Sequence, residues 1–163
     1  DRMGGKITIV ERLESGLSAF KPEIVKWNAG HVQNDKELFT FFTELMPDFK
    51  NRNVRKQKMI EEGLDEKEIA ARMAGEQPMF IFIDNLMDLI NMVYRPSPGV
   101  APMSGFFENI IEKGKLHNIY FIACLRVEDE SLLTGYKAYN AFIADKYGIH
   151  LGGNLAGQKI FNL

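Results

Sequence analysis

Pro78-Met79-Phe80-Ile81-Phe82-Ile83, followed at once by Asp84-Asn85, is the stretch that decides the fold. Its first six residues are apolar without alternation, which is typical of a strand buried on both faces in the middle of a parallel sheet. The apolar positions after Asn85 recur at helical spacing and are Leu86, Leu89, Ile90 and Val93. The sequence therefore predicts a buried strand that ends at an acidic residue and leads into a helix.

Further strands and helices alternate along the chain on both sides of this stretch. Short apolar runs predict strands at 7–10 and 119–125, a short last strand at 149–151 and a possible final one at 160–163. Periodicity and capping residues predict helices at 35–63, 65–74, 86–93, 104–114 and 128–146, whereas 11–30 is expected to be mostly loop. Strands that alternate with helices give an α/β fold with a mainly parallel sheet and flanking helices.

The helix expected at 35–63 has the strongest signal. Its apolar stripe consists of Leu38, Phe39, Phe42, Leu45, Met46 and Phe49. Asn34 or Asp35 is expected to cap its start, Pro47 to kink or restart it, and Gly63 to end it. Its second half carries a basic stretch of Lys50, Arg52, Arg55, Lys56 and Lys58. This basic stretch is either a solvated helix face or a patch that contacts an acidic partner.

Composition narrows the class of protein. The chain has 163 residues, 45% of them hydrophobic and 26% charged, which suits one globular domain with a real core. A net charge of -2 disfavours a dedicated nucleic-acid binder. The single cysteine, Cys124, lies in an apolar run and is expected to be an inert core thiol. His31, His117 and His150 are too widely separated in the sequence to predict a metal site.

Candidate chemistry gathers where the predicted strands end. Parallel strands end at one edge of their sheet, so Glu11, Asp84, Asn85, Leu125 and Arg126 should share a rim. An apolar strand that ends in Asp84 has the form of a Walker B element, which aims a carboxylate at a nucleotide-bound Mg²⁺. The alternative is that Asp84 caps the following helix. The glycine-rich segments at 3–8 and 152–159 lack the spacing and the hydroxyl of a phosphate-binding P-loop.

Several segments, in order along almost the whole chain, resemble the FtsK/SpoIIIE ATPases. Residues 80–89 resemble their Walker B segment, and 51–53 with 56–57 resemble their preceding long helix. Residues 103–110, 113–122 and 148–154 are similar to the last ATPase-like domain of EssC-type motors, which drive type VII secretion in Gram-positive bacteria. The resemblance implies that 1–163 form a single FtsK-like domain with a P-loop NTPase-like (RecA/FtsK-like) core. The first strand and the P-loop of that core are missing from this chain, which should leave a gap in its sheet.

The resemblance also implies a degenerate nucleotide site. Asp84 and Asn85 match the Walker B pair, but Asn85 stands where the family has a water-polarising Glu, and an amide cannot accept a proton. We therefore expect no intact catalytic residue and no metal site, with ATP and Mg²⁺ as possible ligands of the full-length protein only. The alternatives are an active ATPase whose P-loop lies upstream of this chain, or a DNA translocase domain.

The family's setting implies a domain on the cytoplasmic face of the cell membrane, attached through upstream segments, that recognises substrates and regulates the motor. Its expected partners are adjacent ATPase domains of the same motor and the C-terminal signal of small helical secreted substrates. No nucleic acid is expected, and oligomers are possible for the full-length protein. The loop at 95–103 and its flanks are rich in apolar groups, so we expect an exposed partner-binding patch there, made of Met92, Tyr94, Val100, Met103 and Phe106.

Overall fold

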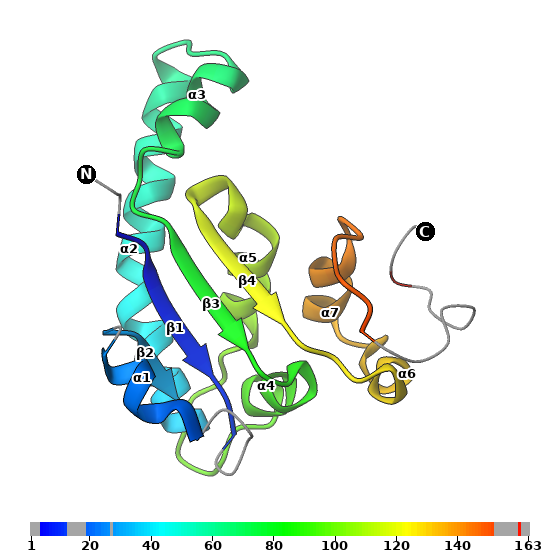
Figure 1. Cartoon of the computed structure of the whole chain (residues 1–163). Coiled ribbons are helices and arrows are strands. Elements are labelled where there is room, and N and C mark those ends of the chain that lie inside the picture. The colour runs from blue at the N-terminus through cyan, green and yellow to red at the C-terminus, as the bar shows by residue number, and fades with distance from the viewer. Residues whose placement is uncertain (1–3, 13–18, 27, 152–159, 161–163) are drawn as a thin grey trace.

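Four parallel strands form the sheet of this α/β protein, in the order β2-β1-β3-β4 (Figure 1). The computed structural model describes residues 4–12, 19–26, 28–151 and 160. The strands are β1 (Lys6–Val10), β2 (Gly30–Val32), β3 (Met79–Ile83) and β4 (Ile119–Ala123). In the central pair Ile7 lies beside Phe80, and in the next pair Phe80 lies beside Tyr120. The predicted parallel sheet of three neighbouring strands is thus confirmed.

Two strand predictions differ from the structure. β2 lies in the segment expected to be loop, because three residues are too few to show a hydrophobic period. Residues 149–151 were expected to form a strand, but they have no regular secondary structure, and Ile149 and Leu151 are almost fully exposed. Most of the possible strand at 160–163 lies outside the described residues.

The long helix α2 (Asp35–Glu61) begins and ends where the sequence predicts. The side chain of Asn34 accepts a hydrogen bond from the Glu37 amide at the start, and Gly63, with φ of 81°, follows the end. The helix does not restart at Pro47, which lies inside it. The second half of α2 continues past the sheet and, with α3 (Glu66–Met73), forms a projecting helical arm (Figure 1). Asp65 and Glu68 form the capping box that starts α3.

One face of the sheet is covered by α2, α4 (Leu86–Tyr94) and α5 (Ser104–Lys113) (Figure 1). The core lies in this layer, and its fully buried members include Leu38, Ile90 and Phe107. The cap position of α5 is Met103, whose side chain makes no capping hydrogen bond. The 3-10 helix η2 (Gly114–His117) then leads into β4.

The helix expected at 128–146 is broken into three pieces. They are the 3-10 helix η3 (Val127–Asp129), α6 (Glu130–Leu133) and α7 (Lys137–Ile143). Gly135 lies at the break between α6 and α7, where a glycine lowers the stability of a continuous helix. The break lets Leu133 and Tyr139 both reach the core. A further short helix, α1 (Lys21–Lys26), precedes β2.

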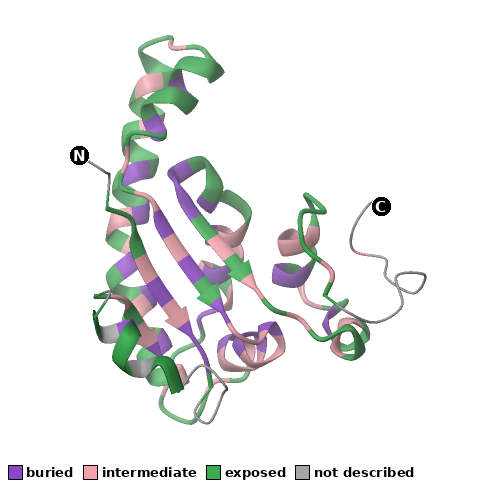
Figure 2. Ribbon diagram, in the orientation of Figure 1, coloured by how far each residue is buried: buried purple, intermediate pink, exposed green. Residues whose placement is uncertain are grey.

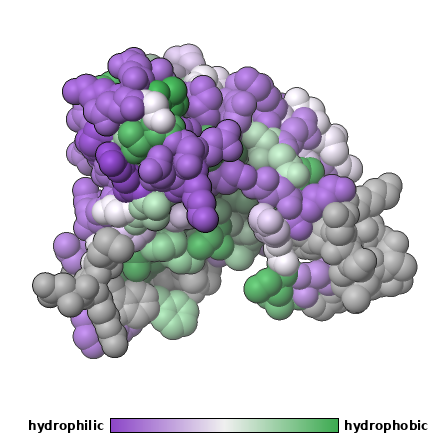
Figure 3. All heavy atoms as spheres, turned by 90° about the horizontal axis from the view of Figure 1, so that it is seen from above, coloured by the Kyte–Doolittle hydropathy of each residue, from purple (hydrophilic) through white to green (hydrophobic). Residues whose placement is uncertain are grey.

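The opposite face of the sheet is largely open, so the expectation that its strands are buried on both faces is wrong for this chain. Phe82, Tyr120 and Ile122 are 38%, 39% and 47% exposed, while Ile81 and Ile83 on the covered face are 2% exposed. Of the described helices, α1 lies in front of this face, at one corner (Figures 1 and 2). The Phe80 and Tyr120 rings stack on it, with centroids 5.5 Å apart. Figure 3, in which the molecule is seen from above, shows hydrophobic groups next to the hydrophilic surface of α2 and α3. Parallel sheets are usually covered on both faces, so this face is incomplete as it stands.

A buried arginine joins α2 to the starts of two strands. Arg52 is 3% exposed and donates to the Gln77 carbonyl at 2.9 Å and the His117 carbonyl at 2.8 Å. Its Nε donates to Asp48 at 3.1 Å. Gln77 and His117 lie just before β3 and β4, so this guanidinium sets where the two central strands begin relative to α2. One member of the predicted basic stretch is therefore structural.

Candidate functional site

The candidate site is the rim formed by the carboxyl ends of β1, β3 and β4. The chain leaves β1 toward β2 on one side and leaves β3 toward β4 on the other, so the ends of β1 and β3 form the switch point of the sheet. Open α/β sheets bind ligands at such a point. The Asp84 amide donates to the Val10 carbonyl at 3.0 Å, which holds the two strand ends together. Glu11 and Asp84 therefore lie on neighbouring strands, as the sequence predicts.

Asp84 is half-buried directly after β3, and its carboxylate makes no hydrogen bond or ion pair with the described residues. The alternative that Asp84 caps the next helix is wrong, because Asn85 is the cap of α4. Its Oδ1 accepts a hydrogen bond from the Met87 amide at 2.9 Å. The acid is thus left available at the rim, while the amide beside it is already engaged with the backbone.

Glu11 is the most buried acid of the rim. Its side chain is 0% exposed, and His31 Nε2 lies 2.5 Å from Glu11 Oε1. Gln33 Nε2 donates to the same oxygen at 3.5 Å. His31 comes from β2, the strand that the sequence did not reveal, so the sequence could not place this histidine beside Glu11. Its only local signal is the short run from Gly30 to Val32 that precedes a helix cap.

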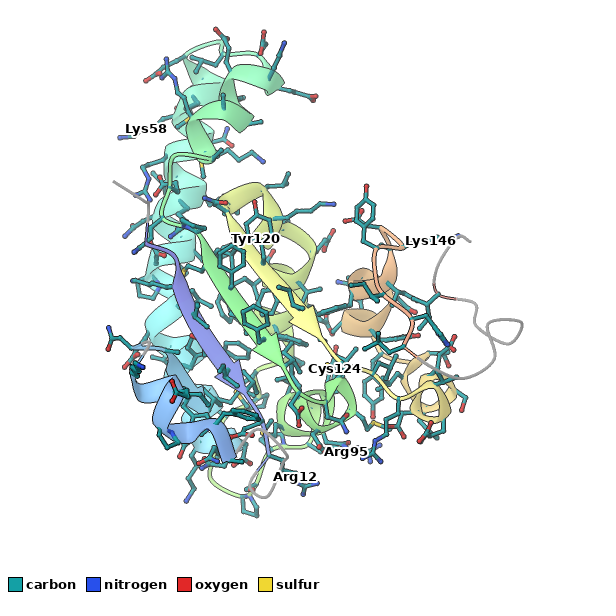
Figure 4. The ribbon with its side chains drawn as sticks, viewed as in Figure 1. Arg12, Lys58, Arg95, Tyr120, Cys124 and Lys146 are labelled. Carbon is teal, nitrogen blue, oxygen red and sulfur yellow. The ribbon has the colours of Figure 1, made fainter. Side chains whose placement is uncertain are left out.

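Arginines line the mouth of the rim. Arg12, just after β1, pairs with Asp88 of α4 at 3.2 Å and so crosses from one side of the switch point to the other. The Arg12 side chain is mostly exposed, so this pair adds little stability. Arg126, beyond β4, is exposed and pairs with no acid of the described residues. Cys124 directly follows β4 and is exposed, not buried as expected (Figure 4).

The main surface hollows of the described residues lie away from this rim. One lies between β2 and the first half of α2 and includes Thr8, Lys36 and Thr40. A second lies between the amino end of β1 and α2 and includes Lys6 and Asp48. Neither is lined by Asp84 or Asn85. In the part of the chain that is described, no three His, Cys, Asp or Glu side chains gather to hold a metal ion. The two hollows are separate from the carboxylates of the rim.

The predicted partner-binding patch is packed against the core. Met103 is 4% exposed, and the half-buried Met92, Tyr94, Val100 and Phe106 all pack against the core. The Phe106 ring meets Phe42 and Phe49 edge-on, at 5.5 and 6.1 Å. The expected exposed patch is therefore corrected, since α4, α5 and α7 close around these side chains. The Ser97 amide, in the loop after α4, donates a hydrogen bond to the Asp35 carboxylate at the start of α2. This hydrogen bond holds the loop against α2 and lowers the pKa of the Asp35 carboxyl.

No family model matches the chain, and neither curated proteins nor solved structures give a match. None of the helices in the described residues is long and apolar enough to span a membrane.

Proposed function

We propose that this chain is a degenerate ATPase-like domain of an FtsK/SpoIIIE-type motor, of the kind that drives type VII secretion. The observation that carries the proposal is the arrangement of Asp84 and Asn85. A carboxylate without a partner among the described residues ends a central parallel strand at the switch point, where a Walker B acid belongs. The next side chain, in the place of the water-polarising acid, is an amide bound to the Met87 amide. This geometry suits a site that keeps its metal-binding acid and lacks a general base.

The open face and edge of the sheet support the same proposal. In FtsK-type ATPases a first strand, a P-loop and its helix come before the part that this chain resembles. β4 ends the sheet, so its outer edge has no partner among the described strands. A strand added at that edge, with its helix on the open face, would cover Phe82, Tyr120 and Ile122.

The domain would act through binding and not through turnover. It would lie at the cytoplasmic face of the cell membrane, attached through other segments of the motor. Adjacent ATPase domains and small helical secreted substrates would be its partners, and ATP with Mg²⁺ a ligand only when a P-loop is present. The rim could then transmit the presence of nucleotide to neighbouring domains through Asp84 without hydrolysing it.

Two measurements test this function. ATP hydrolysis by the full-length protein with Mg²⁺ should not exceed background, and the Asp84→Ala variant should behave identically. Turnover that vanishes in Asp84→Ala would instead establish the active ATPase. The second measurement compares thiol labelling of Ile122→Cys, in a Cys124→Ser background, between this chain and the full-length protein. We expect fast labelling in this chain and protection in the full-length protein.

A matched control separates coverage of the face from a general loss of reactivity. Asn51→Cys also lies on α2, is exposed, and should label at similar rates in both proteins. Equal labelling of Ile122→Cys in the two proteins would show that nothing covers the face and would contradict the proposal.

A further inference from the structure

The second half of α2 carries charges that are separated along the helix. Residues 50–58 hold five basic side chains and no acid, while 61–68 hold five acids and one lysine. Arg52 is buried, and Arg55 pairs with Glu76, with Nε and Oε1 2.5 Å apart. Lys50, Lys58, Glu61 and Glu62 form no ion pair with a described residue. Lys58 projects from α2 away from the sheet (Figure 4). The helical arm is therefore basic over residues 50–58 and acidic over residues 61–68. Several of these charges have no partner of opposite sign among the described residues.

The second half of α2 carries an exposed stripe of four side chains on one side of the helix. Lys50, Val54, Gln57 and Glu61 follow one another at steps of four, three and four residues, and all four are exposed. This is the spacing at which helices meet side by side. Val54 is 53% exposed at the centre of the stripe, and Ile60 beside it is 48% exposed. α3 packs on the side of α2 where Arg52 and Met59 lie, so the described part of the chain leaves the stripe uncovered.

The stripe of one copy is complementary to the same stripe of a second copy that runs in the opposite direction. If two copies lie antiparallel with their two-fold axis between Val54 and Gln57, Lys50 of each copy faces Glu61 of the other, and Val54 faces Gln57. One contact thus forms twice, which is the property of a closed two-fold interface. The arm projects beyond the sheet (Figure 1), so an antiparallel pair centred on the arm would place the two sheets at opposite ends.

We propose that this chain self-associates through α2, as an antiparallel pair held by reciprocal Lys50–Glu61 contacts around Val54. The contact covers about three helical turns, which is small for a protein interface, so the association is weak and depends on concentration. It also depends on salt, because its specificity comes from exposed charges. The proposal does not rest on the proposed function, since it uses only the exposed surface of α2.

Zero-length carbodiimide cross-linking tests it directly. Lys50 and Glu61 of one helix are separated by about 16 Å of helical rise, so an amide bond between them can form only between two copies. Mass spectrometry of the concentrated protein at low salt should find this cross-link. It should disappear at about 1 M salt, where the screening length is about 3 Å. Sedimentation velocity over a range of concentrations should show a dimer under the same low-salt conditions.

Charge reversal supplies the control. Lys50→Glu and Glu61→Lys should each weaken dimerisation by about tenfold, because like charges then face each other twice. The double variant restores opposite charges and should restore the dimer. Glu62→Lys lies off the stripe and should leave the dimer unchanged, and circular dichroism checks that every variant is folded. A chain that is monomeric at all concentrations at low salt, or a double variant that fails to recover the dimer, would overturn the proposal.

Discussion

The hydroxyl of Tyr94, at the end of α4, donates a hydrogen bond to Glu108 Oε1 of α5 across 2.6 Å. The hydroxyl oxygen of Tyr94 accepts a hydrogen bond from the Ala138 amide of α7 at 3.4 Å, and the Tyr94 ring contacts the Tyr136 ring with centroids 4.8 Å apart. Burial and this hydrogen bond to Glu108 raise the pKa of Tyr94 to about 12. One side chain thus joins three helices, and it belongs to the set that the sequence assigned to an exposed partner-binding patch.

Replacing Tyr94 with Phe should lower the free energy of unfolding by about 1 kcal/mol, because Glu108 loses a donor and the Ala138 amide loses an acceptor. Urea unfolding measures the change, and hydrogen exchange should quicken at the Ala138 amide. Tyr136→Phe keeps the ring contact and removes a hydroxyl for which no hydrogen bond is described, so it is the matched control. An equal effect of the two variants would show that the hydroxyl of Tyr94 adds nothing.

Protonation of His117 should destabilise the protein. The imidazole is 1% exposed, its Nδ1 has no hydrogen-bond partner, and it meets the Phe49 ring edge-on at 5.1 Å. Burial, and then the charges of Lys56, Arg52 and Lys113, lower its pKa from 6.5 to about 4. The folded protein therefore resists a proton that the unfolded chain accepts. The resulting stability is complete above pH 6.5 and is lost as the pH falls toward 4.

Between pH 6.5 and 4, the free energy of unfolding measured with urea should fall by up to about 1.4 kcal/mol per pH unit because of His117. His117→Leu removes the titrating group and should flatten this slope. Leu116→Ala, at an exposed position next to His117, keeps the imidazole and should leave the slope unchanged. A slope that persists in His117→Leu would assign the acid sensitivity to other groups.

Loss of Arg52 should be far more costly than loss of its neighbour Arg55. Arg52→Met leaves the buried carbonyls of Gln77 and His117 without a donor, and we expect a loss of about 3 kcal/mol. Arg55 has a half-exposed side chain and pairs only with Glu76, so Arg55→Met should cost less than about 1 kcal/mol. Thermal or urea unfolding measures both. Similar costs would mean that the strand starts do not depend on the guanidinium of Arg52.

The two faces of the sheet should respond differently to the same substitution. Ile81 is 2% exposed on the covered face, and Ile122 is 47% exposed on the open face. Ile81→Ala should lower the free energy of unfolding by about 3 kcal/mol, since it leaves a cavity in the core. Ile122→Ala should cost less than about 1 kcal/mol, because the side chain already contacts water. A large cost at Ile122 in this chain would show that its face is covered.

Local pattern was sufficient for much of the fold. The apolar run of β3, its end at Asp84 and the stripe of α2 are properties of neighbouring residues, and each was predicted from the sequence. The same holds for the capping box of α3, whose two partners are three residues apart. Parallel neighbours follow from strands that alternate with helices, so the rim that joins Glu11 to Asp84 could also be foreseen.

The sequence by itself determined the strands β1, β3 and β4 and the helices α2 and α3, because period and capping act within a few positions. It did not reveal β2 or the break between α6 and α7. Tertiary structure alone decided that Met103 is buried, that Arg52 leaves the basic stretch to bind two distant carbonyls, and that His31 reaches Glu11. It alone decided that Ile122 is exposed although its run is as apolar as that of Ile81. The physical reason is that burial depends on which element packs over a side chain, and that element comes from another part of the chain or from outside it.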